Sequence, residues 1–221
     1  MKKYFEVLGQ CPLFAGIGAQ DMEAMLGCLE AQVKTFAKNE YIFREGEAAG
    51  RIGVLLEGSA RVEQTDYFGN RRIMAGLETG ELFGESFACA GVQQLPVDVV
   101  AGEPAAVLFI DSGRITQTCC NACAFHQKMI YNLMQVLAVK NLMFHQRITV
   151  TAGRTTRDKL MAYLLLQAKR AGSPRFEIPF DRQGLADYLG VDRSGLSAEI
   201  SKLRKEGRLT SEKNKFVLRE E

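Results

Sequence analysis

The chain has 221 residues, of which 47% are hydrophobic and 24% charged, and it carries 28 Lys and Arg against 26 Asp and Glu. This composition is that of a globular protein with a sizeable core. No apolar run approaches the ~20 residues that a membrane helix needs, and the first residues, MKKYFEVLGQCPLF, lack the apolar core of a signal peptide. Six cysteines at irregular spacing do not form the pattern of a secreted disulfide scaffold. We therefore expect a cytoplasmic protein with reduced thiols and no membrane partner.

Charge is distributed unevenly along the chain. Residues 152–221 hold 15 Lys and Arg against 10 Asp and Glu, whereas residues 1–151 hold 13 against 16. A basic end joined to a neutral or acidic end is typical of a nucleic-acid-binding domain that follows a regulatory domain. Chance variation between two domains is the alternative, and charge alone does not exclude it.

Residues 33–110 have the pattern of short β-strands separated by glycines. The strand-length runs IGVLLEG, SARVEQT, RRIMAGL, VDVVAG and AAVLFID are rich in β-branched and apolar residues. FGN at residues 68–70 has the chemistry of a turn between two of them. Residues 1–115 are therefore predicted to form an antiparallel β-roll, or jelly roll, preceded by helical pieces such as AQDMEAMLGCLEA.

Residues 116–150 contain neither Gly nor Pro, which predicts one long helix. Its apolar residues cover more than one stripe: Phe125, Met129, Ile130, Leu133, Val136, Leu137, Leu142, Met143 and Phe144. A helix that is apolar on two sides must bury two sides. One side can pack on the β-roll, and the other is explained most simply by the same helix of a second copy. The alternative is the central helix of a single core.

Residues 151–221 are predicted to form a winged helix-turn-helix, so the fold class is α+β. Asp181 can cap a first helix through Tyr188, Gly190 can take a positive φ in a tight turn, and Asp192 can cap a second helix to about Lys205. This is the spacing of a helix-turn-helix. The apolar residues expected between the two helices are Leu185, Ala186, Leu189, Val191, Leu196, Ile200 and Leu203. KNKFVLR closes the domain as a hairpin strand.

The outward positions at the start of the second helix carry groups that can read DNA. Arg193 can donate two hydrogen bonds to a guanine, and Ser194 and Ser197 can bond base edges or phosphates. Arg182 and Gln183 begin the first helix, where their donors would meet a phosphate. In the hairpin, Lys213 and Lys215 offer a second contact to the DNA backbone. The competing interpretation is a helical hairpin used for contact with a protein.

Three segments, FREGE, GELFGES and LADYLGVDRSGLSAEISKLRKEG, together with the order of the domains, resemble the cAMP receptor protein/FNR (CRP/FNR) family of bacterial transcription regulators. The resemblance covers nearly the whole chain. It implies a homodimer joined by the long helix and bound to a near-palindromic site in double-stranded DNA, with RNA polymerase as a candidate partner. Arg193 resembles the family's guanine-reading arginine, and Arg182 and Gln183 resemble its phosphate-contacting pair. Ser194 replaces a glutamate and Ala198 a second arginine of the best-known members, which indicates a different half-site.

The resemblance also places an effector pocket in the β-roll. Gly84 and Glu85, followed by Ser86, match the pair that contacts the ribose in cyclic-nucleotide-binding members, whereas Leu95 and Pro96 replace the Arg-Ser pair that holds the phosphate. On the long helix, Val139 and Lys140 replace the polar pair that meets the adenine. An unpaired buried phosphate costs several kcal/mol, so we expect an uncharged effector that is not a cyclic nucleotide. The identity of that effector, and of any cofactor, stays unknown.

A cluster of cysteines at the start of the long helix suggests an alternative function. Cys119, Cys123 and His126 lie at i, i+4 and i+7, and Cys120 or Cys89 could complete four metal ligands. The chain would then be a redox- or metal-sensing transcription regulator with the β-roll as a scaffold. The competing interpretation is that these cysteines are small buried hydrophobes. No catalytic constellation is present in the sequence, so an enzyme is not expected.

Overall fold

The computed structural model describes residues 2–65, 67, 68, 71–116 and 124–219. The chain forms two compact units, Met1–Val139 and Lys140–Glu221. Within the described residues, no helix has both the length and the apolarity to cross a membrane.

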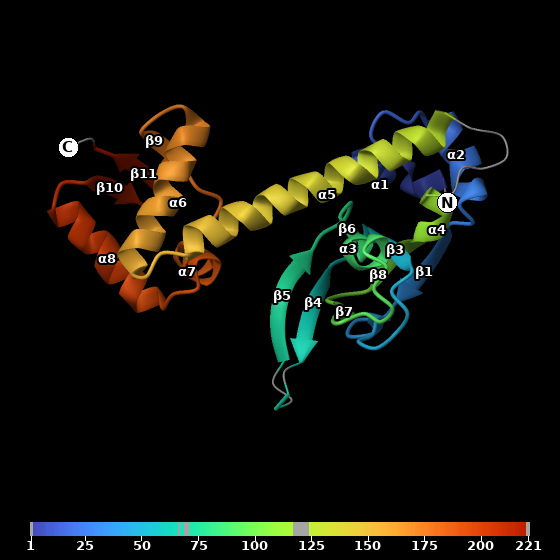
Figure 1. The fold of residues 1–221 in the computed structure, drawn as a ribbon, viewed down its shortest axis with the longest axis horizontal. Coiled ribbons are helices and arrows are strands. Elements are labelled where there is room, and N and C mark those ends of the chain that lie inside the picture. Colours follow the sequence, from blue (N-terminus) through green and yellow to red (C-terminus); the bar gives the residue numbers. More distant parts are fainter. Residues whose placement is uncertain (1, 66, 69–70, 117–123, 220–221) are drawn as a thin grey trace. The chain divides into compact units, whose positions relative to one another are not determined.

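The first unit is a β-roll built from two antiparallel four-stranded sheets. The strand orders are β1-β8-β3-β6 and β2-β7-β4-β5, and β4 and β5 form a long hairpin (Figure 1). The strands are β1 (Gln32–Phe36), β2 (Tyr41–Phe43), β3 (Arg51–Glu57), β4 (Ala60–Thr65), β5 (Arg71–Leu77), β6 (Leu82–Phe83), β7 (Asp98–Ala101) and β8 (Ala105–Asp111). The helical pieces are η1 (Lys2–Tyr4), α1 (Phe5–Gln10), η2 (Pro12–Phe14), α2 (Ala19–Cys28), α3 (Glu85–Cys89) and α4 (Ser112–Thr116). The predicted jelly roll with preceding helical pieces is confirmed.

Strands β3 and β8 are buried on both faces, which explains why their sequences read as continuous apolar runs. Because side chains alternate along a strand, Val54 and Leu108 point to one face and Leu55 and Val107 to the other. The first face packs against the N-terminal helices, and the second faces the interior of the roll between the two sheets. The central sheet is therefore covered on both sides within the first unit.

The long helix α5 runs from Ala124 to Thr151. The sequence predicted its start at Thr116, but α4 ends there, and residues 117–123 lie outside the described residues. At its N-terminal end Met129 and Leu133 are buried in the first unit, and Asn132 Nδ2 donates to the carbonyl oxygens of Leu13 and Ala15, each at 2.9 Å. This half of α5 is thus fixed to the N-terminal helices by apolar contact and by two buried hydrogen bonds.

The second unit is a winged helix-turn-helix. After the end of α5, it consists of α6 (Thr156–Ala171), β9 (Arg175–Glu177), α7 (Arg182–Leu189), α8 (Arg193–Lys205), β10 (Leu209–Glu212) and β11 (Lys215–Leu218). The three strands form one antiparallel sheet in the order β10-β11-β9. Its core is a cluster of fourteen buried residues from α5, α6, α7, α8 and the sheet, among them Leu160, Tyr163, Leu196 and Phe216. The predicted fold class is confirmed for both units.

Candidate nucleic-acid interface and effector pocket

Helices α7 and α8 begin at the aspartates that the sequence singled out. The Asp181 carboxylate accepts a hydrogen bond from Gly184 N–H at 2.7 Å, and the Asp192 carboxylate accepts one from Gly195 N–H at 2.9 Å. Each bond satisfies one amide that a helix N-terminus leaves without a partner. Between the helices Gly190 adopts φ 60° and ψ 50°, the left-handed conformation that ends α7. Both predicted caps and the predicted turn are confirmed.

The two helices meet through the apolar residues that the sequence predicted. Leu185, Ala186, Leu189, Leu196, Ile200 and Leu203 are buried, and Val191 is partly buried against the same cluster. These contacts leave Arg193 and Ser194 exposed at the start of α8 and Ser197 half-buried one turn later. The helix therefore presents the three residues expected to read base edges on its uncovered side.

An ion-pair network that sequence reasoning missed holds α8 against α6. The Arg157 guanidinium donates to both carboxylate oxygens of Glu206, and its Nη1 lies 3.5 Å from Glu199 Oε1. Hydrogen bonding from Arg157 lowers the pKa of Glu206 and raises the pKa of Arg157 itself. Glu199 and Glu206 lie 42 and 49 positions after Arg157 in the sequence, so no local sequence pattern could have paired them with it. Lys202, Arg204 and Lys205 also place positive charge in the last turn of α8.

Arg182 and Gln183, the expected phosphate contacts, both make contacts within the domain. Arg182 Nη2 lies 3.4 Å from the carbonyl oxygen of Lys213, and its guanidinium is 5.9 Å from the centre of the Phe216 ring. Burial lowers the pKa of Arg182. Gln183 Nε2 donates to Asp187 Oδ1 at 2.9 Å, which uses one of the two N–H donors of its amide. The Arg182 side chain thus lies against the hairpin and does not project into solvent from the start of α7.

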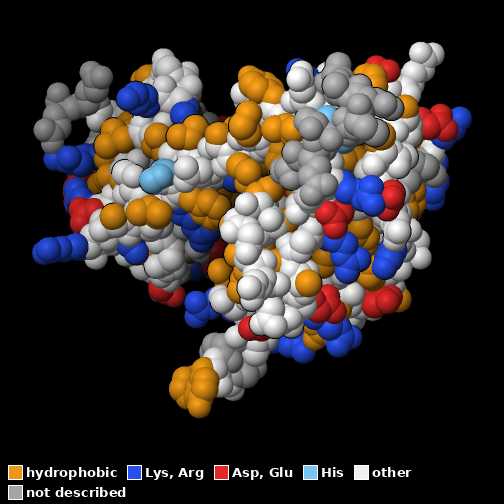
Figure 2. Space-filling view, turned by 45° about the vertical axis from the view of Figure 1, so that its right-hand side comes forward, with side chains coloured by type: hydrophobic (Ala, Val, Ile, Leu, Met, Phe, Trp, Pro, Cys, Tyr) orange, Lys and Arg blue, Asp and Glu red, His pale blue; other side chains and the backbone are white. Residues whose placement is uncertain are grey.

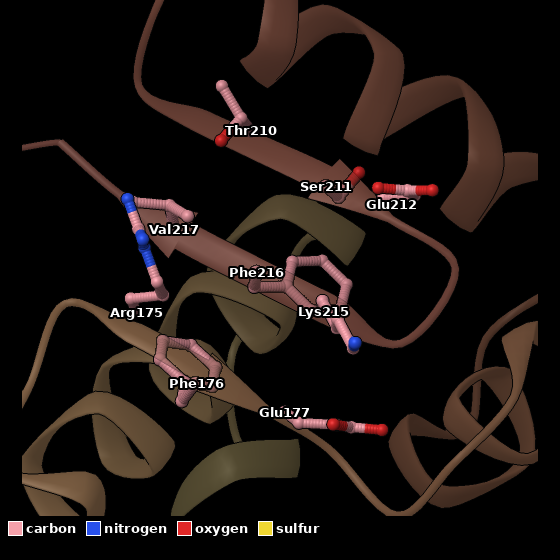
Figure 3. A pocket seen from close by; sticks show the side chains of 9 residues that line it. All are labelled: Arg175, Phe176, Glu177, Thr210, Ser211, Glu212, Lys215, Phe216 and Val217. Carbon is pink, nitrogen blue, oxygen red and sulfur yellow. The ribbon is translucent and has the colours of Figure 1, made fainter.

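The hairpin of β10 and β11 forms the wing. Its turn contains Lys213, at φ 51°, and Asn214, whose side-chain amide donates to Glu177 Oε1 and to the carbonyl oxygen of Ile178. On the sheet lies a shallow cavity of ≈ 470 Å³. Figure 3 shows Arg175 beside Val217 at one end of it, and Lys215, Glu177 and Glu212 at the other. This face carries charges of both signs, and the turn beside it carries Lys213.

The residues of the predicted effector pocket are only partly brought together. Gly84 adopts φ 80°, and a side chain there would meet the Phe43 ring at 2.9 Å and the carbonyl oxygen of Arg51 at 3.1 Å. Glu85 is 2% exposed and accepts a hydrogen bond from the Ser86 hydroxyl at 2.9 Å. The Gly-Glu pair therefore sits in a tight, structurally constrained turn at the start of α3.

The replaced phosphate-binding pair is apolar in structure as well as in sequence. Leu95 is 3% exposed in the interior of the roll, and its backbone bonds to Gly46 and Glu47 at 2.8 Å each. Pro96 is exposed. On α5, Val139 is 52% exposed, and Lys140 belongs to the other compact unit. Arg71, the first residue of β5, could neutralise an anionic ligand only if its side chain pointed into the roll.

Arg71 is engaged elsewhere on the roll. Its Nη2 donates to the Tyr41 hydroxyl at 3.1 Å, and its Nη1 lies 4.0 Å from Glu63 Oε2. Glu63 is buried and also pairs with Arg61. These contacts hold the Arg71 guanidinium against β2 and β4, next to a carboxylate that Arg71 shares with Arg61.

Of the proposed metal ligands, Cys119, Cys120 and Cys123 lie outside the described residues. His126 is 3% exposed on α5. Burial, and then the nearby Glu85, raise the pKa of the Cys89 thiol, which favours the protonated form that binds metals poorly. Across the part of the chain that the structure describes, no three His, Cys, Asp or Glu side chains form a group that could hold a metal ion.

Two domain families match the chain. The cyclic nucleotide-binding domain matches residues 33–121, and the Crp-like helix-turn-helix domain matches residues 158–221. The global nitrogen regulator of Nostoc sp. is 22% identical over 198 residues, which cover 87% of this chain and 87% of that protein. The nitrogen fixation regulation protein FixK of Azorhizobium caulinodans is 25% identical over 198 residues, which cover 83% of this chain and 73% of FixK.

A solved structure supports the same fold. The c-di-GMP responsive global regulator CLP of Xanthomonas campestris matches with a TM-score of 0.57 and 18% identity, over 92% of this chain and 100% of CLP. The fold and the helix-turn-helix define a DNA-binding transcription regulator, not an enzyme. The chain belongs to the CRP/FNR family of transcription regulators.

Proposed function

We propose that the chain is a homodimeric, sequence-specific regulator that binds a near-palindromic DNA site and is switched by an uncharged small molecule in the β-roll. The capped, exposed start of α8 carries the DNA-binding part of this proposal, since it presents Arg193 at the first helical position. An arginine there can bond guanine O6 and N7 together, and the lysines of the wing and of α8 supply contacts to phosphates. Such a regulator acts on RNA polymerase in the bacterial cytoplasm.

Binding-site selection from a random duplex library tests the reading of DNA. The selected site should contain two related half-sites, and Arg193→Ala should weaken binding to it by about 1–3 kcal/mol, or roughly 5- to 150-fold. Binding of the same variant to random DNA should change little, because the lost contact is to a base. An equal loss on selected and random DNA would show that Arg193 contacts the backbone instead.

The exposed apolar side of α5 supports the homodimer. Tyr131, Met134, Leu142 and Ile148 are all more than half exposed, and their spacing keeps them on one side of a helix that supercoils at about 3.5 residues per turn. Figure 2 shows hydrophobic side chains, in orange, at the surface of the molecule. A second copy of α5 is the simplest apolar surface to cover this stripe.

Sedimentation of the full chain tests the dimer. Leu142→Glu combined with Ile148→Glu places two charges in the stripe and should give a monomer. Leu165→Glu is the matched control, since Leu165 is equally exposed (56%) but lies on α6. This control should sediment as the wild type, and a monomeric wild type would contradict the proposal.

Leu95 supports an effector other than a cyclic nucleotide. It is buried where the family's phosphate-binding arginine would lie, and Arg71 is already paired with Glu63. A cyclic phosphate would therefore meet an apolar side chain in place of an arginine, while the Arg71 guanidinium is held by Tyr41 and Glu63. Calorimetric titration with cAMP and cGMP should give no saturable heat, and binding at micromolar concentrations would contradict this part of the proposal. The alternative, redox or metal sensing, gains no support from the described residues.

A further inference from the structure

The hydroxyl of Ser194 has a fixed role in the helix cap. Ser194 is the second residue of α8, and its Oγ–H donates to Asp192 Oδ2, the same oxygen that accepts from Gly195 N–H. The hydrogen bonds from Ser194 and then from Gly195 lower the pKa of Asp192, so its carboxyl group is ionised at neutral pH. An ionised carboxylate has no proton to donate. The shared hydrogen therefore comes from the serine.

A serine has one hydrogen and two lone pairs, so Ser194 retains only its capacity to accept. Phosphate oxygens offer acceptors alone, as do guanine and the O4 of thymine on their major-groove edges. The donors in the major groove are the amino groups of adenine N6 and cytosine N4. An exposed oxygen that can only accept is thus matched to the amino groups of adenine and cytosine and to none of the backbone groups.

We propose that Ser194 reads an exocyclic amino group, on an adenine or a cytosine, next to the guanine that Arg193 reads. The inference rests on the proposed function, because it assumes that the start of α8 enters the major groove. It makes Ser194 a specificity-determining residue and excludes it from contact with phosphate. It also makes Asp192 a positioning residue, since Asp192 decides which hydrogen-bonding role the serine keeps.

Deletion of single amino groups from the DNA tests the proposal. In the selected site, each adenine is replaced in turn by purine and each cytosine by pyrimidin-2-one, and the Kd of the full-length protein is measured by fluorescence anisotropy. At one position in each half-site the deletion should weaken wild-type binding about three- to tenfold, the value of one neutral hydrogen bond. Ser194→Ala should bind the intact site that much more weakly and show no further loss on deletion at that position.

Two further variants keep the result interpretable. Ser197→Ala, one turn away on the same helix, should retain the full effect of that deletion. Asp192→Gly removes the acceptor while leaving a residue that helix N-caps tolerate. The Ser194 hydroxyl can then also donate, so this variant should accept guanine or thymine at that position with a penalty several times smaller than that of the wild type.

Other outcomes overturn the inference. Equal weakening of selected and random DNA by Ser194→Ala would assign the serine to a phosphate. Coupling of Ser194 to a deleted carbonyl oxygen would show that its hydroxyl donates. If no site is selected at all, the proposed function fails and the inference with it. That case is distinguishable, since Arg193→Ala would then have no specific effect either.

Discussion

Tyr163 carries a buried hydroxyl whose removal should stabilise the second unit. The side chain lies on α6 and is 1% exposed, with ring centres of Phe180 and Tyr188 at 6.2 and 5.3 Å. Its hydroxyl has no hydrogen-bond partner among the described residues. Tyr163→Phe removes that oxygen and keeps the ring that fills the core.

The expected gain in stability follows from the loss of the tyrosine hydroxyl. Burial of a hydroxyl without a hydrogen bond costs about 1–3 kcal/mol in proteins, whereas the volume and ring contacts of phenylalanine are nearly those of tyrosine. We therefore expect the free energy of unfolding to rise by about 1 kcal/mol. This is the lower end of that range, because the removed oxygen leaves a small space that costs part of the gain. For a unit of this size, such a gain raises the melting temperature by about 4–8 °C.

Calorimetric melting of the full chain, with circular dichroism as a second probe, measures this gain. Tyr67→Phe is the control, since the Tyr67 side chain is 96% exposed and lies in the first unit; it should change little. A Tyr163→Phe protein less stable than the wild type would refute the reasoning, because it would mean that the hydroxyl has a partner that stabilises it.

The same side chain predicts a pH dependence in alkali. Burial, with a smaller contribution from Tyr188, raises the pKa of Tyr163 to about 12. Since the folded state disfavours the phenolate, the stability of the wild type should fall as the pH rises above about 10, the ordinary pKa of tyrosine. Tyr163→Phe should lose less stability between pH 10 and 12.

Four other changes test the local structure. Asp181→Ala should lower the free energy of unfolding by about 1 kcal/mol, as seen in denaturant titration, because the first amides of α7 lose their cap. Gly190→Ala should cost about 1 kcal/mol from the left-handed backbone alone, since a side chain there meets no other atoms within 4 Å. Gly84→Ala should cost more, roughly 2 kcal/mol, because it adds the contacts with Phe43 and Arg51 to the positive φ. Hydrogen bonds in the folded state lower the pKa values of Asp192 and Glu206. Their contributions to the free energy of unfolding should therefore be complete above about pH 5 and be lost as the pH falls below about 4. Thermal melts at a series of pH values should show this loss, and Glu206→Gln should make it smaller.

Much of the DNA-binding site was predictable because its determinants are local. An aspartate three residues before the amide that it caps, or a glycine in a tight turn, acts over one helical turn. The bond between Ser194 and Asp192 is equally local, since a serine two residues after an N-cap aspartate lies within reach of its carboxylate. Arg182 could not be placed in this way, because its contact with Lys213 depends on where the wing returns.

The sequence by itself determined the order of the elements, both helix caps, the apolar contact between α7 and α8, and the apolar replacement of the phosphate-binding pair. These features depend on residue type and on spacings of a few positions. Only the tertiary structure decided that Arg157 secures α8 through Glu206, that Arg71 lies beside Glu63, and that Leu95 lies in the interior of the roll. Those pairings join segments distant in the chain, and which segments meet is set by the burial of the whole core.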